Sequence, residues 1–401
     1  MDKKRIGIIT MHRIVNYGSA LQAYATVKIL SNMGFESKII DYQYPSDYHF
    51  FNIITHGRYK NNIVWNKLLL LSSHFNLLLK YKSLKRALFH FKEWKNYILL
   101  KKRFKKWRKC FCPQTRSYSR QSILAHPPIF DGYITGSDQT FKAINLGNDF
   151  TFLLDFAPEK ALKLAYSASF GSAEFPSSFI KDYAVRLQNY HAISVREASG
   201  QTIVQQLCGK HAELVLDPSM LLSEAEWLSI SAPNLHTDRD YCLCYLLRGV
   251  FMPFPLLNNL IKKIYEISGL ELVFIGEITP KSKDFPPYHA FTAADPSEFI
   301  ALYSEAKFVL TNSFHGTAFA LNFKKPFLSI TPPQTLANDD RIISLLERLN
   351  LSSRGIPADN IEKIENELSK DLFSLNYKDI PLEYWQKKSL SFLHDNLVKN
   401  L

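Results

Sequence analysis

Cysteine is scarce in this 401-residue sequence, and the few cysteines are poorly placed for pairing. There are five of them, an odd number, and none forms a C-x-x-C pair. A disulfide framework needs paired cysteines, and a structural zinc site needs closely spaced ligands. The sequence therefore predicts neither, and unpaired thiols are typical of a reducing cytoplasm.

Long apolar runs are also missing. Residues 68–79 form the most apolar stretch, but polar residues interrupt it, and it falls short of the roughly 20 residues that span a bilayer. The apolar part of the opening MDKKRIGIIT is too short for a signal peptide. We therefore expect a cytoplasmic protein.

Acidic residues are scarce in one segment, which explains the overall charge. The chain carries a net charge of +12, and residues 80–109, with thirteen basic residues and one acid, carry all of it. Apolar residues make up 46% of the chain and charged residues 21%, as in ordinary globular proteins. The high pI thus describes one segment and not a uniformly cationic surface.

Alternating strand and helix patterns predict an α/β protein. Residues 5–10 are an apolar run typical of a buried parallel strand, residues 20–33 have helical spacing, and residues 35–41 form the next strand. The pattern resumes after an insertion, and a second set occupies residues 241–330. We expect two Rossmann-like domains that face each other across a cleft between the carboxyl ends of their strands.

The composition also predicts the domain boundaries. The first domain covers residues 1–222 and contains a basic, helical insertion at residues 44–127. A polar, proline-containing linker follows at residues 223–240. The second domain covers residues 241–345, and a helical tail ends the chain at residues 346–401.

His315 is the sharpest single candidate for chemistry. It lies between a predicted strand and a predicted helix at residues 317–323, where helix amides favour anions. Histidine titrates near neutral pH, so it can move a proton or bind a phosphate as a cation. The alternative is that His315 only packs against the turn or caps it.

Polar residues also follow the strands of the first domain. Asp138 can act as a base or bind sugar hydroxyls, and it can equally cap the next helix. Arg196 can bind a phosphate or a carboxylate in a bidentate pair, or form a salt bridge with Glu197. Asn16 and Gly18 lie in a loop where the backbone can approach a ligand, or they form an ordinary turn.

Weaker signals complete the list. Arg341 is a second candidate cation, with a solvated helix start as its alternative, and Asp217 before a proline more often marks a strand end than a catalytic acid. The histidines are scattered without H-x-x-x-H spacing, so no metal site is predicted. G-x-G-x-x-G, P-loop and G-x-S-x-G motifs are missing, which argues against a dinucleotide, a nucleoside triphosphate and a serine hydrolase.

Taken in order, five motifs resemble those of the polysaccharide pyruvyl transferase family over residues 5–345. They are NYGSALQA from Asn16, GSDQ from Gly136, SVRE from Ser194, LDP from Leu216 and NSFHG from Asn312. The resemblance implies a GT-B-like fold. It also implies transfer of a pyruvyl group from phosphoenolpyruvate to sugar hydroxyls of a cell-surface polysaccharide or its lipid-linked precursor. The product is a cyclic ketal, and phosphoenolpyruvate is a substrate, so no cofactor is implied.

The resemblance also implies roles for particular residues. Arg196 and His315 would contact phosphoenolpyruvate, and His315 would be the acid or base. Asp138 would be the second catalytic candidate. The further candidates for substrate binding are Asn16, Gly18, Ser313 and Arg341.

The sequence departs from the family pattern in three places. Ser19 follows Gly18 where many members have aspartate, and Phe141 stands where many have tryptophan. Residues 332–335 contain no lysine, whereas some members carry a donor-binding lysine there. The replacement would have to be Lys324, Lys325 or Arg341, so a GT-B-type nucleotide-sugar glycosyltransferase of polysaccharide biosynthesis stays open as an alternative.

The basic segment at residues 80–109 predicts a surface rather than a catalytic site. Apolar residues and lysines alternate there with a helical period, which suits an amphipathic helix whose stripe is formed by Leu84, Leu88, Phe91, Lys95 and Leu99. We expect peripheral attachment to an anionic membrane at its inner face, with a solvated basic face as the alternative. Interleaved aromatics could stack on nucleic acid bases, but no nucleic-acid module is recognisable, so we expect no such partner.

Overall fold

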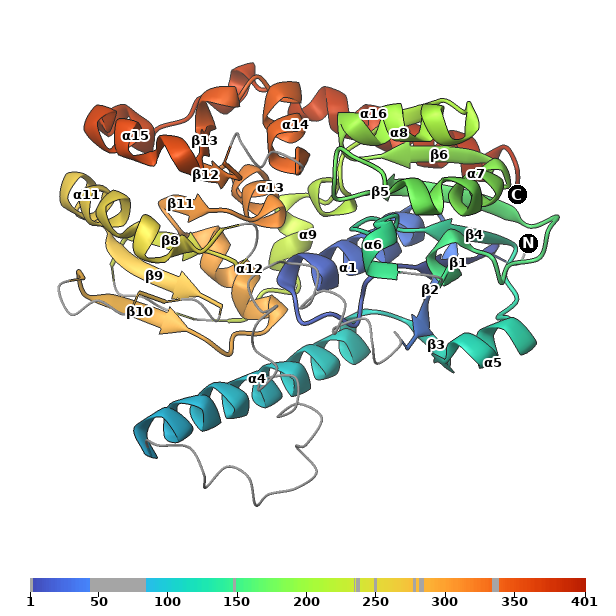
Figure 1. Cartoon of the computed structure of the whole chain (residues 1–401), viewed down its shortest axis with the longest axis horizontal. Helices are drawn as coiled ribbons and strands as arrows, with labels where there is room; N and C mark the ends of the chain where they lie inside the picture. Colours follow the sequence, from blue (N-terminus) through green and yellow to red (C-terminus); the bar gives the residue numbers. More distant parts are fainter. Residues whose placement is uncertain are drawn as a thin grey trace.

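The protein contains two parallel β-sheets, of seven and six strands, with helices packed against them (Figure 1). The computed structural model describes residues 3–43, 84–146, 149–233, 235, 239–248, 251–276, 279–280, 285–333 and 339–401. The two sheets belong to two Rossmann-like α/β domains, which confirms the predicted fold class.

The first sheet has the strand order β3-β2-β1-β4-β5-β6-β7, and every pair in it is parallel. Its central strands are almost fully buried because short apolar runs such as Ile6, Ile8 and Ile9 lie between helices on both sides. The strands are β1 (Arg5–Ile9), β2 (Glu36–Tyr42), β3 (Gln114–Tyr118), β4 (Gly132–Thr135), β5 (Leu162–Ala168), β6 (Ala192–Val195) and β7 (Ala212–Leu214).

The second sheet has the order β10-β9-β8-β11-β12-β13 and is also parallel. The direction of strand addition reverses between β1 and β4 in the first sheet and between β8 and β11 in the second. Ligands of open α/β sheets bind at such switch points, beyond the carboxyl ends of the strands. The strands are β8 (Tyr241–Tyr245), β9 (Glu271–Ile275), β10 (Tyr288–Phe291), β11 (Phe308–Thr311), β12 (Phe327–Thr331) and β13 (Gly355–Pro357).

Side chains cap the two helices that leave the switch points. The Asn16 side chain accepts a hydrogen bond from the Ser19 backbone at the start of α1, and the Ser313 side chain accepts one from the Gly316 backbone at the start of α13. The helices are α1 (Tyr17–Asn32), α4 (Leu84–Phe111), α5 (Arg120–Ala125), α6 (Ala143–Leu146), α7 (Ile180–Gln188), α8 (Ala198–Cys208), α9 (Glu224–Leu228), α10 (Pro253–Leu256), α11 (Asn258–Ser268), α12 (Pro296–Glu305), α13 (Phe314–Asn322), α14 (Arg341–Arg348), α15 (Ile361–Glu367) and α16 (Leu382–Val398).

The basic helix α4 joins the two domains at one side of the molecule (Figure 1). Arg103 forms ion pairs with Asp295 and Glu298 at the start of α12, at 2.9 and 2.8 Å. Phe104 packs against Tyr17 of α1, with ring centroids 5.2 Å apart. The insertion from the first domain therefore contacts both domains.

The buried stripe of α4 differs from the predicted one. Leu100, Phe104 and Trp107 are buried, whereas Lys95 and Leu99 of the predicted stripe are exposed. The side chains of the other predicted members lie outside the described residues. The apolar spacing therefore indicated a helix. Which side of this helix is buried depends on where α1 and α12 pack against it.

The insertion and the linker contain elements that the sequence analysis did not predict. The expectation for residues 44–127 was helical, but β3 lies within that range and forms the edge of the first sheet. Its sequence QTRSY has only one buried side chain, so it lacks the apolar signal of a central strand. The linker at residues 223–240 contains α9, whose Trp227 is fully buried.

The predicted helical tail at residues 346–401 is part of both domains. β13 pairs with β12 and completes the second sheet, so this sheet extends beyond residue 345. α16 returns to the first domain, where the Ser389 hydroxyl accepts a hydrogen bond from the Leu216 backbone at 2.8 Å. A three-residue strand leaves no periodic pattern, which explains why the sequence did not reveal it.

No helix among the described residues combines the length and apolar character needed to cross a bilayer.

Candidate functional site

Five chain segments come together where the carboxyl ends of the two sheets meet, and four of them carry a charged or titratable side chain. Gly18 follows β1, Asp138 follows β4, Arg196 follows β6 and Asp217 follows β7, while His315 follows β11 of the other sheet. Parallel strands deliver their carboxyl ends to one edge of a sheet, so these segments become neighbours although they are far apart in sequence. We call Asp138, Arg196, Asp217 and His315 the central cluster.

An ion pair buried from water lies at the centre of this cluster. Arg196 is 0% exposed and Asp217 is 1% exposed, and an Arg196 Nη1–Asp217 Oδ2 hydrogen bond of 2.9 Å joins them. The Ser137 hydroxyl donates a further hydrogen bond of 2.6 Å to the same carboxylate oxygen, and Arg196 lies over the Phe314 ring. Such burial is tolerated only because each charge has a partner.

The environment keeps the Asp217 carboxylate ionised. Burial on its own would raise the pKa of Asp217, but the neighbouring His315 imidazole, the Arg196 charge and the Ser137 hydroxyl hold that pKa well below its usual range. The acid that the sequence analysis judged more typical of a strand end is therefore a permanent negative charge at the centre of the cluster.

Asp138 occupies a strained backbone position that directs its carboxylate into the cluster. Its φ of 77° lies in the left-handed region, which few residues other than glycine, asparagine and aspartate adopt. Its side chain accepts hydrogen bonds from the Ser19 hydroxyl at 2.5 Å and from Arg196 at 3.4 Å. Burial alone would raise the pKa of Asp138, but Arg196 and then His315 outweigh it, so the pKa is lowered.

His315 lies in the first turn of α13 and faces the first domain. The helix was predicted to start at residue 317, but the Ser313 cap starts it earlier, so the imidazole is held by a helix and not by a loop. Its Nε2 atom lies 3.5 Å from the Asp217 carboxylate, which is too long for a strong hydrogen bond. This buried nitrogen makes no hydrogen bond within the described part of the chain.

Gly18 leaves the space that the imidazole occupies. A Cβ atom at this position would stand 2.0 Å from His315 Nδ1, well inside contact distance. Any other residue would force the ring or the two domains to move. The glycine of the first loop therefore allows a close contact between the domains.

Glu197 and Arg348 surround the cluster. Burial raises the pKa of Glu197, and its Oε2 atom lies 3.8 Å from Arg196 Nε, a distance at which neither atom forms a hydrogen bond with the other. Arg348 donates a hydrogen bond of 2.6 Å to the Arg196 carbonyl, and burial lowers its pKa to about 10. Helix α14 of the second domain is thereby fixed to the strand end that carries Arg196.

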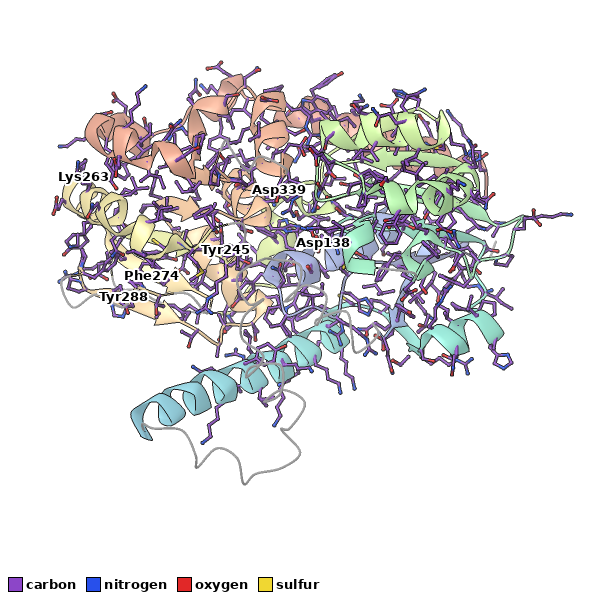
Figure 2. The ribbon with its side chains drawn as sticks, in the orientation of Figure 1. Asp138, Tyr245, Lys263, Phe274, Tyr288 and Asp339 are labelled. Atoms are coloured by element: carbon purple, nitrogen blue, oxygen red, sulfur yellow. The ribbon has the colours of Figure 1, made fainter. Side chains whose placement is uncertain are left out.

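A second group of charges lies at the partly exposed edge of the cluster. Arg341 pairs with Asp339 through Nε and Nη2, and Gln139 of the first domain accepts from Arg341 Nη1 at 2.7 Å in the amide orientation that its neighbours require. Lys142 lies beside Gln139, since both side chains flank Gly171. Figure 2 labels Asp138 and Asp339 where the two halves of the molecule meet.

The structure brings most of the predicted site residues together. Gly18, Asp138, Arg196 and His315 lie within one cluster, and Arg341 lies at its edge. Asn16 and Ser313 cap the two helices whose first turns reach the cluster. The proposed roles of these residues toward substrates stay predictions.

Several members of the site were not selected from the sequence. They are Ser137, Gln139, Lys142, Asp217 and Asp339. Ser137, Gln139 and Asp217 lie inside motifs that the sequence analysis quoted, so their position after strands was a usable signal. Lys142 and Asp339 have no comparable signal, because their approach depends on how the two domains meet.

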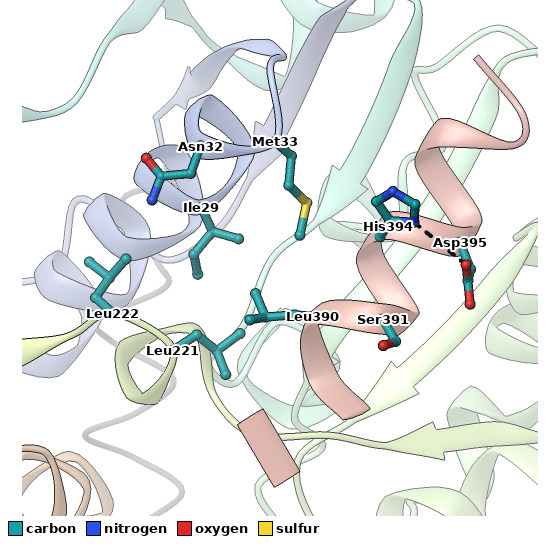
Figure 3. A pocket seen from close by; sticks show the side chains of 9 residues that line it. All are labelled: Ile29, Asn32, Met33, Leu221, Leu222, Leu390, Ser391, His394 and Asp395. Carbon is teal, nitrogen blue, oxygen red and sulfur yellow. Dashed lines mark ion pairs between the residues drawn. The ribbon is translucent and has the colours of Figure 1, made fainter. Parts of the chain in front are cut away.

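The structure also has hollows away from the cluster. A pocket of about 370 Å³ lies between α1, the segment around Leu221 and α16 (Figure 3), and no member of the central cluster lines it. Its His394 side chain pairs with Asp395 on the same helix. Among the described residues, no three histidine, cysteine or acidic side chains gather in a way that could hold a metal ion.

Comparisons with known proteins address the fold and the family separately. The chain is similar to S. aureus MnaA in a co-structure with UDP, at 15% identity and a TM-score of 0.53 over 98% of this chain and 97% of that one. It is also similar to the UDP-GlcNAc 2-epimerase from Neisseria meningitidis bound to UDP-GlcNAc, at 10% identity and a TM-score of 0.51 over 98% and 100%. Such low identities support the GT-B-like fold alone. No curated protein matches the sequence significantly, whereas the profile of the family described as polysaccharide pyruvyl transferase matches residues 16–333.

The contact between Gly18 and His315 predicts a coupled effect on stability. In the wild-type background, Gly18→Ala should destabilise the protein by about 1–3 kcal/mol because the new methyl group overpacks the imidazole. In a His315→Ala background the same change should cost clearly less, since the contacts with Nδ1 and Cγ at 2.0 and 2.1 Å are gone and only the Cβ contact at 2.6 Å remains. Urea denaturation of the four proteins measures the coupling.

An equal effect of Gly18→Ala in both backgrounds would mean that the two domains do not meet at this point. The His315→Ala protein serves as the internal control, because it differs from the double variant only by the methyl group at residue 18.

Proposed function

Because the chain belongs to the polysaccharide pyruvyl transferase family, we propose that it transfers the pyruvyl group of phosphoenolpyruvate to two hydroxyls of a sugar. The acceptor is a cell-surface polysaccharide or its lipid-linked precursor. The observation that carries the proposal is the buried histidine at the domain boundary, held opposite an ionised aspartate and beside a buried arginine.

The reaction defines what the site must supply. Two sugar oxygens form bonds to C2 of phosphoenolpyruvate, the bond from C2 to the phosphate oxygen breaks, and the methylene carbon gains a proton to become the methyl group of the ketal. Of the two hydroxyl protons released, one balances the methyl group and the other balances the departing phosphate. The site therefore needs a group that moves protons and cations that stabilise the phosphate and the carboxylate.

His315 suits the proton transfer. Imidazole exchanges protons near neutral pH, and the Nε2 atom of His315 is not committed to a strong hydrogen bond within the described residues. The Asp217 carboxylate lies 3.5 Å from this atom, so its negative charge stabilises the protonated ring.

The other candidates suit binding better than proton transfer. The lowered pKa of Asp138 makes it a weak base, so its carboxylate is better suited to accept hydrogen bonds from acceptor hydroxyls. Arg196 already binds Asp138 and Asp217, so its charge acts on the donor through this network. Asn16 and Ser313 hold the helix starts that face the substrates.

Substrates must enter between the domains. The members of the central cluster are 0–8% exposed, so the structure corresponds to a closed arrangement of the site. Opening would separate Gly18 from His315 and Gln139 from Arg341, two of the contacts that cross the boundary. Closure around both substrates would then exclude water from the ketal-forming step.

The alternative is a GT-B-type glycosyltransferase that uses a nucleotide sugar. The structural relatives that bind UDP or UDP-GlcNAc share only the fold with this chain, so they do not favour that activity here. Turnover of phosphoenolpyruvate or of a nucleotide sugar distinguishes the two hypotheses.

The role of His315 in proton transfer predicts a catalytic defect when it is replaced. In His315→Asn, phosphate release from phosphoenolpyruvate in the presence of oligosaccharide and lipid-linked sugar acceptors should fall by about 10²–10⁴-fold, as expected when a proton-transfer group is removed. His394→Asn, an exposed histidine on α16, is the matched control and should keep the wild-type rate. Wild-type turnover in His315→Asn would refute the assignment, and wild-type turnover of a nucleotide sugar instead of phosphoenolpyruvate would favour the alternative.

Helix α4 supplies a surface that suits a lipid-linked substrate. Its Leu100, Phe104 and Trp107 pack inward, while the exposed face carries Lys101, Lys102, Lys105, Lys106 and Lys109. We propose that this face holds the protein against the anionic cytoplasmic leaflet. Each lysine near such a surface contributes about 1 kcal/mol of attraction. Because α4 also contacts Tyr17 beside the first loop, attachment would place the site close to the membrane.

The exposed face of α4 predicts lipid-dependent binding. The wild-type protein should float with phosphatidylserine-containing vesicles and not with neutral vesicles, and changing Lys101, Lys102, Lys105 and Lys106 to glutamine should abolish flotation. A control with the same loss of charge changes four exposed lysines elsewhere to glutamine: Lys160, Lys181, Lys370 and Lys378. Equal flotation of both variants, or equal binding to both kinds of vesicle, would contradict the proposal.

A further inference from the structure

Lys142 is a cation that the function proposed above does not use. It follows Asp138 by four residues in the loop that leads from β4 to α6, and its side chain is partly exposed. No described residue forms a hydrogen bond or a salt bridge with its ammonium group, although the carboxylates of Asp339 and Asp138 lie near enough to act on its charge. The other cations of the site differ, since Arg196 pairs with Asp217 and Arg341 pairs with Asp339.

The surroundings of Lys142 place it beside Arg341 of the other domain. The Gln139 and Lys142 side chains both lie against Gly171, where a Cβ atom would stand 3.0 Å from Gln139 Cδ and 3.1 Å from Lys142 Cδ. Gln139 in turn accepts two hydrogen bonds from Arg341. One glutamine thus separates two positive groups that come from opposite sides of the domain boundary.

The charges around Lys142 favour an anionic ligand. Burial and the Arg341 charge lower the pKa of Lys142, while Asp339 and Asp138 offset part of that effect. Two cations held this close repel each other, and a bound anion would relieve the repulsion. A phosphate group suits the position because it can accept hydrogen bonds from an ammonium and a guanidinium at once.

We propose that Lys142 and Arg341 together bind the phosphate of the donor at the partly exposed edge of the central cluster, with Lys142 as its direct ligand. The inference rests on the proposed function for the identity of the donor but not for the phosphate chemistry. The proposal places the direct phosphate ligand in the first domain. The candidates from the sequence were Lys324, Lys325 and Arg341, which all belong to the second domain. Lys324 and Lys325 follow the C-terminal end of α13, whereas His315 lies in its first turn.

The position also explains how a donor could draw the domains together. A phosphate held by Lys142 from the first domain and Arg341 from the second would add a link across the boundary that Gln139 already bridges. The phosphate would then leave through the partly exposed edge, while the reacting carbon stays near His315 in the buried cluster.

Calorimetric titration of the full-length protein with phosphoenolpyruvate, and separately with inorganic phosphate, tests this proposal. Lys142→Met should weaken the binding of both by about tenfold or more, as expected when a charge-assisted hydrogen bond to phosphate is lost. Lys142→Arg keeps the charge and should stay within about threefold of the wild type. Lys160→Met, which removes an exposed lysine far from the cluster, is the control and should bind both as the wild type does.

The outcomes separate this proposal from the proposed function. Wild-type binding of both ligands by Lys142→Met would overturn the role of Lys142 and leave the donor assignment intact. Binding of inorganic phosphate but not of phosphoenolpyruvate by the wild type would overturn the donor assignment, and loss of that phosphate binding in Lys142→Met would still support the site. A wild-type protein that binds neither ligand would overturn the proposal.

A pH series distinguishes a direct ligand from a structural role. Because the pKa of Lys142 is lowered, its positive charge and hence the phosphate affinity of the wild type should decrease as pH rises through that pKa. Lys142→Arg should lose this decrease, since arginine stays charged throughout. Identical alkaline profiles for the two proteins would contradict direct binding by Lys142, even if Lys142→Met proved unstable.

Discussion

The ion pair between Arg196 and Asp217 is the interaction on which the site depends. Both groups are cut off from water, so each requires the other, and removing one partner of such a pair typically costs about 3–5 kcal/mol. Their charges also lower the pKa of Asp138 and place a fixed negative charge opposite His315. The sheet topology makes this possible, because β1, β4, β6 and β7 belong to one parallel sheet and end at the same edge of it. The chemistry of the cluster follows from how these four strands are ordered.

The second domain supplies the residues that complete the site at the edge of the first sheet. His315 comes from the second domain and fits only because residue 18 is a glycine, and Arg348 fixes α14 to the carbonyl of Arg196. Helix α4 adds a further connection through Arg103, which joins the insertion to the start of α12. The site therefore exists only when both domains are in place. A transferase benefits from this arrangement, because two substrates can enter an open site and react in a closed one.

Local patterns in the sequence predicted most of the elements and much of the cluster. Buried parallel strands are short apolar runs, so β1 and β2 were predicted to within one residue of their observed bounds. β3 and β13 were missed because edge strands are short and lack that pattern. His315 and Arg196 were found because they follow strands within motifs, whereas Asp217 was set aside, since its partner Arg196 is separated from it by a helix and a strand. Lys142 could not be found at all, because its significance comes from Arg341 across the domain boundary.

The most direct measurement of the central claim is the steady-state kinetics of Asp217→Asn, which keeps the shape of the side chain and removes its charge. If Asp217 orients His315 for proton transfer, kcat for phosphate release from phosphoenolpyruvate should fall by about a hundredfold, while KM for phosphoenolpyruvate changes little. A folded Asp217→Asn protein with the wild-type kcat would contradict the account, because the buried ion pair would then stabilise the fold without taking part in the reaction.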